Sequence, residues 1–208
     1  MKLDPSILRT LSLDPATTTV STHGSSGFNS TAKITTTLPN KTQKHLFMKS
    51  APGTAAAEMF RGEHASLNAI HNVVPSLCPA SLATGVTEDG NAFLVTDFLD
   101  MSSKSRSSSS STSSAAGESQ KHPHSGMSLA AKLATLHTTP APTPPGYQTP
   151  HFGFPVTTCC GSTPQPNTYT PSWAAFYSEP PPASHPLQMR AQPRRRCRFP
   201  RVGHADRR

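Results

Sequence analysis

The sequence has little of what most folds of its length use for stability. Hydrophobic residues make up 34% of the 208 residues, aromatic residues 6%, and tryptophan occurs once, whereas proline occurs 22 times. Such a chain cannot bury enough apolar surface along its whole length to offset the entropy cost of ordering it. The composition therefore predicts one small folded part with disordered additions.

Cysteine and long hydrophobic runs are also scarce. The four cysteines show no disulfide-framework spacing, Cys159 and Cys160 are adjacent, and no Cys-x-x-Cys pair occurs. This argues against a disulfide scaffold and against a zinc site. No stretch approaches the roughly 18 apolar residues of a membrane span, and the amino terminus has no apolar signal core. We expect a reduced, cytoplasmic protein without a membrane partner.

Acidic residues are few, 11 against 19 basic ones, but the net charge of +8 belongs to one end of the chain. Up to Pro180 there are 11 Lys/Arg and 10 Asp/Glu, whereas eight arginines and one acidic residue follow. A basic tail can bind nucleic acid without a folded site. No base-stacking aromatic residues are interleaved with the arginine run at 194–196, so we interpret the tail as solvated and do not expect nucleic acid as a partner.

Regular patterns dominate the first hundred residues. Asp4 or Ser6 can cap a short helix that runs through Leu11. Thr54 to Asn72 has the strongest helical pattern, with an apolar stripe. Turn residues and β-branched runs predict five strands, at 17–22, 31–38, 44–49, 81–87 and 92–96. Further on, Ser128 can cap a helix that ends at His137.

The connection between the first two predicted strands is rich in glycine. His23 to Phe28 reads HGSSGF, and glycine lets backbone amides approach phosphate oxygens closely. Alone this pattern is weak, and an ordinary hairpin explains it equally well. Walker-type phosphate binding is excluded because no GxxxxGK[ST] string occurs.

Three later features strengthen the phosphate-binding interpretation by their order. Lys49 lies on the third strand, Glu63 lies on the apolar stripe of the main helix, and Asp97 to Leu99 follow the last strand. An unpaired carboxylate on an apolar stripe is costly, so Glu63 either reaches solvent at the edge or has a cationic partner. Kinases use this order of glycine turn, strand lysine, helix glutamate and adenine-binding connector. We therefore predict an α+β fold, the amino lobe of a protein-kinase-like fold, with a five-stranded antiparallel sheet and one main helix.

Four segments and three aromatic residues resemble the amino-terminal part of the fructosamine-3-kinase family, also called ketosamine-3-kinases or protein-ribulosamine 3-kinases. The resemblance runs from about Met1 to Tyr177, with the serine-rich stretch Ser102 to Ser125 as an interruption. The matching residues are Met59–Ile70 (MFRGEHASLNAI), Ala92–Met101 (AFLVTDFLDM), Leu129–His137 (LAAKLATLH), Phe152–Asn167 (FGFPVTTCCGSTPQPN), Trp173, Phe176 and Tyr177.

The resemblance implies an activity and a set of site residues. The activity is transfer of the γ-phosphate of ATP, with Mg²⁺, to O3 of a ketosamine formed on a protein lysine, a fructosamine or ribulosamine, which leads to deglycation. The partners are then glycated proteins or small ketosamines. The implied ATP-binding residues are Gly24 and Gly27 in the phosphate loop, Lys49 at the phosphates, Glu63 positioning Lys49, and Asp97, Phe98 and Leu99 at the adenine.

The chain also departs from the family pattern. The family has a His-Gly-Asp catalytic loop followed by a later Asp-Pro-Ala that supplies a metal-binding aspartate. We find no such catalytic loop with a later Asp-Pro-Ala in this chain, so we expect the catalytic base and the metal-binding aspartate to be missing. The residues that follow are rich in proline and arginine without periodicity, so we hypothesise a frameshift, a retained intron or a gene-model error near Ser178. We then expect a kinase by descent that is inactive as written. The alternative is a non-catalytic fragment that binds a nucleotide or another partner.

These patterns predict four parts along the chain. They are an amino lobe at 1–101, a disordered serine-rich linker at 102–127, the truncated start of a carboxy lobe at 128–178, and a disordered tail at 179–208.

Overall fold

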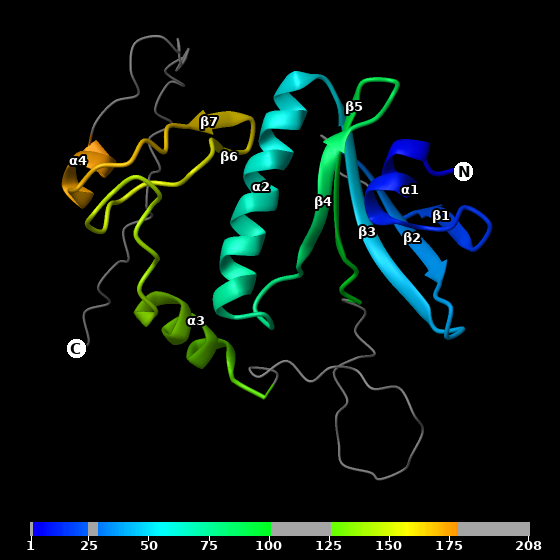
Figure 1. Cartoon of the computed structure of the whole chain (residues 1–208), viewed down its shortest axis with the longest axis horizontal. Coiled ribbons are helices and arrows are strands. Elements are labelled where there is room, and N and C mark those ends of the chain that lie inside the picture. The colour runs from blue at the N-terminus through cyan, green and yellow to red at the C-terminus, as the bar shows by residue number, and fades with distance from the viewer. Residues whose placement is uncertain (1, 25–28, 101–125, 179–208) are drawn as a thin grey trace, which may run out of the picture.

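The computed structural model describes residues 2–24, 29–100 and 126–178 (Figure 1). The predicted tail and all but the last two residues of the predicted linker lie outside these ranges. The helices are α1 (Pro5–Leu11), α2 (Thr54–Val73), α3 (Leu129–Thr138) and α4 (Trp173–Ser178). The strands are β1 (Thr18–Thr22), β2 (Ser30–Thr37), β3 (Gln43–Pro52), β4 (Ser81–Val86), β5 (Asn91–Asp97), β6 (Thr158–Cys160) and β7 (Thr163–Gln165).

Strands β1 to β5 form one antiparallel sheet in the order β1-β2-β3-β5-β4. Three successive strands pair as a meander, and the hairpin of β4 and β5 then adds to the free edge of β3 through β5. The long helix α2 connects the two groups and lies alongside the sheet (Figure 1). The predicted five-stranded sheet with one main helix is confirmed, and the fold is that of a kinase-like amino lobe.

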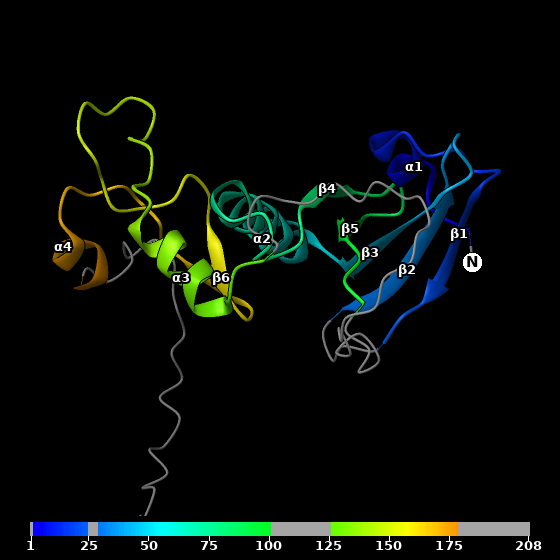
Figure 2. The same cartoon turned by 90° about the horizontal axis from the view of Figure 1, so that it is seen from below.

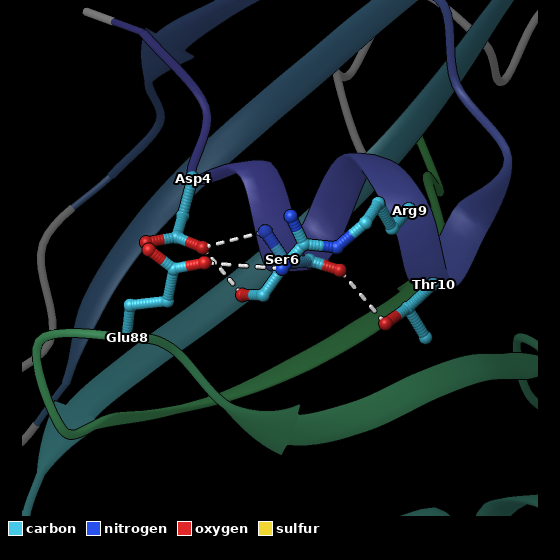
Figure 3. A network of polar contacts seen from close by, with 5 residues as sticks. All are labelled: Asp4, Ser6, Arg9, Thr10 and Glu88. Carbon is cyan, nitrogen blue, oxygen red and sulfur yellow. Dashed lines mark hydrogen bonds and ion pairs between the residues drawn. The ribbon is translucent and has the colours of Figure 1, made fainter.

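Helix α1 covers one face of the sheet. Its Ile7 is buried together with side chains of the same face of β2, β3 and β5, among them Ile34, Leu46 and Val95. Asp4 caps this helix, since its Oδ1 accepts a hydrogen bond from the backbone N–H of Ser6 at 2.8 Å. Figure 3 shows this cap beside the ion pair that Arg9 forms with Glu88 in the β4–β5 turn.

Helix α2 packs on part of the opposite face. Phe60 is fully buried against Ala51 of β3 and against Ala92 and Leu94 of β5. The apolar stripe of α2 faces the sheet because Phe60 and Ala56 bury their apolar surface there. The helix therefore covers β4, β5 and the adjoining end of β3 on this face.

The predicted helix after Ser128 is α3, and its cap is as expected, with Ser128 Oγ accepting from Ala131 N–H at 3.2 Å. The short hairpin of β6 and β7 was not predicted. It lies against α2 at Gly62, on the side away from the sheet, so that α2 is between the sheet and the carboxy-terminal elements (Figure 2). Among the residues described, no helix is long and apolar enough to cross a membrane.

Candidate functional site

The Nζ of Lys49 lies 2.6 Å from Oε1 of Glu63. Side chains alternate along β3, so Leu46 and Met48 point into the core under α1 and Lys49 points to the other face. There it meets Glu63, which α2 places at the edge of its buried stripe. The structure thus gives Glu63 the cationic partner that the sequence allowed as one of two possibilities.

This pair is neither buried nor fully solvated. The side chain of Lys49 is 29% exposed and that of Glu63 is 32% exposed. An ammonium group has three N–H donors, and Glu63 occupies one of them, so the others are available to an anion that approaches from solvent. The pair can hold a lysine charge in a fixed position for a phosphate group.

The glycine-rich connection is partly described. Gly24 has a φ of +72°, a conformation that glycine adopts without strain, and it lies two residues after the end of β1. The strand pairing extends to His23, whose N–H donates to the Thr31 carbonyl at 3.1 Å. Gly27 lies outside the described residues, so its predicted contact with phosphate stays a prediction.

The connector, Asp97-Phe98-Leu99, begins with the last residue of β5, where Asp97 pairs with Leu46 of β3. The Asp97 N–H donates to the Ala80 carbonyl at 3.0 Å and the Phe98 N–H to the His45 carbonyl at 3.4 Å. Leu99 has left the sheet and is 54% exposed. The connector therefore passes from paired to open backbone within three residues, and its predicted role in adenine binding stays a prediction.

Three side chains near the connector were not singled out from the sequence. The Phe98 ring lies 5.0 Å from the His23 ring and 6.3 Å from the His45 ring, centroid to centroid, and Lys33 Nζ lies 4.4 Å from its centroid. Strand alternation alone places His45 on the same face as Lys49, which lies four residues further along β3. Lys33 could be placed on that face only once the register of β2 against β3 was known.

A surface hollow of about 480 Å³ lies elsewhere, between the start of α2 and the end of β4. Its lining includes Thr54, Glu58, Arg61 and Val86, and it contains neither Lys49 nor Glu63. It is therefore separate from the predicted nucleotide site.

Metal ligands are not gathered in the part of the chain that the structure describes, where no three His, Cys, Asp or Glu side chains could hold one ion. One Asp-Pro-Ala string occurs, at Asp14-Pro15-Ala16, before β1. The Asp14 carboxylate accepts a hydrogen bond from the Ala16 N–H at 2.8 Å and so closes a turn.

The sequence model for fructosamine kinase matches residues 15–181. The chain is similar to the chloroplastic protein-ribulosamine 3-kinase of Oryza sativa subsp. japonica, with 28% identity over 67% of this chain and 34% of that protein. It is 29% identical to the ketosamine-3-kinase of Mus musculus, over 64% of this chain and 43% of that protein. A chloroplastic protein-ribulosamine 3-kinase of Arabidopsis thaliana is 28% identical over 58% of this chain and 30% of that protein.

The chain thus spans between 30% and 43% of the length of the curated relatives it matches. The family match covers well over half of its own residues and includes every element from β1 to α4. The chain therefore belongs to the fructosamine kinase family.

Proposed function

We propose that this chain binds ATP on the face of the sheet that carries Lys49, with the Lys49 ammonium at the phosphates. The observation that supports this is the 2.6 Å ion pair between Lys49 and Glu63, which fixes a partly exposed positive charge. Electrostatic positioning of phosphate groups is most of what a phosphoryl-transfer site does. Gly24 and Gly27 contribute backbone amides to the phosphates, and Asp97 to Leu99 contribute the adenine contacts.

We propose that this nucleotide site serves the phosphorylation of protein-bound ketosamines, fructosamine or ribulosamine, at O3. This phosphorylation leads to deglycation. The names of the relatives support this substrate class. Glycated proteins or small ketosamines are then the partners, without nucleic acid. Mg²⁺ enters with the nucleotide, and we place the protein in the cytoplasm.

We further propose that this chain by itself does not transfer phosphate. The 208 residues contain no His-Gly-Asp string to supply a base, and their one Asp-Pro-Ala closes a turn before β1. Catalytic groups of a kinase act as a unit, so losing the base and metal ligands removes nearly all activity. The expected outcome of an assay with Mg-ATP and a small fructosamine is no phosphorylated product above background.

Nucleotide binding is tested by thermal unfolding with and without millimolar Mg-ATP. Wild type should be stabilised by ATP, Lys49→Ala should lose that stabilisation, and Lys44→Ala should keep it, because Lys44 is an exposed lysine at the start of the same strand. Each variant is compared with its own midpoint without ligand, since Lys49→Ala also leaves Glu63 unpaired. Equal stabilisation of Lys49→Ala and wild type, or none in either, would contradict the proposal.

A second candidate function is a non-catalytic interaction fragment. The observation that favours it is a group of neighbouring aromatic side chains at α4, of which Trp173 is 56% exposed, Tyr177 80% and Phe152 44%. Exposed apolar groups of this kind mark interaction sites. If Mg-ATP fails to stabilise the chain, this candidate becomes the better one, and fluorescence of the single tryptophan is its natural reporter.

A further inference from the structure

We propose that the Phe98 ring occupies the position of the nucleotide base, so that the ring must swing away before a nucleotide binds. His23, Lys33 and His45, which surround the ring, are then base-contacting residues. The inference rests on the proposed nucleotide site, and it adds a residue that regulates access to that site.

The first step is that Phe98 lies on the same face of the sheet as Lys49. His45, Phe47 and Lys49 alternate with the buried Leu46 and Met48 along β3, so all three share the face opposite α1. On β2, Lys33 is the register partner of Phe47 and shares that face. Lys33 and His45 of this set contact the Phe98 ring, and His23, which follows β1, contacts it as well, so the Phe98 side chain has folded back over the sheet.

The second step is that α2, the helix on this face among the described residues, packs beside this part and not over it. Helix α2 covers Ala51, Ala92 and Leu94, further along the same face. Phe47 lies two residues before Lys49, about 7 Å along the strand at the usual rise per residue. A base that rests here therefore lies within a nucleotide's length of the Lys49 ammonium.

The third step is the chemistry of the groups around the ring. Lys33 Nζ lies 4.4 Å from the ring centroid, a cation–π geometry, and the His23 ring meets Phe98 edge-on at 5.0 Å. The same His23 ring lies 6.2 Å from Phe47. A cation above a planar ring with aromatic edges beside it suits a nucleobase as well as a phenyl ring. Phe98 thus makes the contacts that a base would make.

The fourth step is that the ring is free to leave. Phe98 is only partly buried, and it lies one residue past the end of β5. A single hydrogen bond of its backbone amide, 3.4 Å long, joins it to His45. A rotation of the side chain toward solvent breaks no strand pairing, so the ring can exchange with a ligand.

A ring that competes with the base lowers the apparent affinity for a nucleotide, because only the fraction of molecules with the ring displaced can bind it. A polyphosphate without a base does not meet this competition. The test is therefore calorimetric titration of the full chain with Mg-ATP and with Mg-tripolyphosphate. The variants are Phe98→Ala and, as a control, Leu82→Ala, which truncates an exposed leucine on the edge strand β4 that makes none of the ring contacts of Phe98.

We expect Phe98→Ala to bind Mg-ATP at least about threefold more tightly than wild type. Its affinity for Mg-tripolyphosphate, and both affinities of Leu82→Ala, should be unchanged. Weaker or equal binding of ATP by Phe98→Ala would overturn the inference, because the ring would then support the base or lie elsewhere. An equal gain for ATP and tripolyphosphate would overturn it as well.

Failure of the inference can be told from failure of the proposed function. Binding of both ligands that depends on Lys49, without a gain in Phe98→Ala, overturns only the role of Phe98. No binding of either ligand by any variant overturns both. If Phe98→Ala does not fold, as judged by circular dichroism, Phe98→Leu keeps the apolar volume, removes the ring plane and should change ATP affinity in the same direction.

Discussion

Gly62 lies directly against the backbone of Thr157. A Cβ atom on Gly62 would come within 2.5 Å of the Thr157 carbonyl oxygen, closer than real Cβ contacts, and within 3.1 Å of the Thr158 Cα. A glycine in the middle of a 20-residue helix is unfavourable by itself, so this position is explained by the close approach of β6. The contact fixes the carboxy-terminal elements on α2.

Gly62→Ala should therefore destabilise the protein despite the better helix propensity of alanine. In an open helix this substitution would gain about 1 kcal/mol, whereas a forced backbone shift costs about 1–3 kcal/mol. Urea unfolding should show a net loss of stability. Ala69→Gly, at an exposed position of the same helix, measures propensity alone, and a stabilised Gly62→Ala would refute the contact.

The ion pair of Lys49 and Glu63 should couple more strongly than that of Arg9 and Glu88. The first pair is about one-third exposed at 2.6 Å, whereas the second is 67% and 69% exposed at 3.1 Å. Exposed pairs contribute about 0.2–1 kcal/mol. Double-mutant cycles with Lys49→Met/Glu63→Gln and Arg9→Met/Glu88→Gln should therefore give a coupling near the top of this range for the first and near zero for the second. Equal couplings would show that the fold does not hold Lys49 in place.

Asn68 should be one of the most sensitive positions on α2. Its Oδ1 accepts from the Ser81 N–H and its Nδ2 donates to the Ser81 carbonyl, both at 3.0 Å, so it acts like a strand partner for the start of β4. Asn68→Asp removes the donor and places a carboxylate against a carbonyl, at an expected cost of about 1–3 kcal/mol. Asn72→Asp, at an exposed position one turn later, is the matched control and should change the unfolding midpoint little.

The two adjacent cysteines should react at different rates. Burial, and after it the carboxylate of Glu58, raises the pKa of the Cys159 thiol. Less of it is therefore the reactive thiolate at pH 8, and its access is also lower than that of the exposed Cys160. Mass spectrometry after timed iodoacetamide treatment should find Cys160 modified first, and Glu58→Gln should speed the reaction of Cys159. Faster labelling of Cys159 than of Cys160 would contradict the packing of β6 on α2.

The same raised pKa has a consequence for stability. When the pKa of a thiol is higher in the folded state than in the unfolded state, its contribution to stability is complete at a pH below the unfolded-state pKa. The contribution is lost as the pH rises through the folded-state pKa. Stability should therefore decline above about pH 8.5, the usual value for a cysteine thiol. The decline should be smaller in Cys159→Ser, as measured by unfolding at pH 7 and at pH 9.5.

Local signals in the sequence determined most of the amino lobe. Asp4 and Ser128 cap α1 and α3 because a short oxygen-bearing side chain can take up a free amide of a helix's first turn. Strand pattern and turn residues located β1 to β5, and the spacing of Phe60 and Glu63 on one helical face located the stripe of α2. These features depend on neighbours within a few residues, so they can be predicted without a fold.

Contacts between distant segments were decided by the tertiary structure alone. The strands β6 and β7 have three residues each, too few to show an alternation of apolar and polar residues in the sequence. Their hairpin forms where Gly62 lets the backbone of Thr157 approach α2. The place of the Phe98 ring depends on the register of β2 against β3, which brings Lys33 beside Phe47. The sequence determined that Lys49 and Glu63 exist in the right order, and the fold decided their 2.6 Å contact, because 14 residues of chain must turn back before the two charges meet.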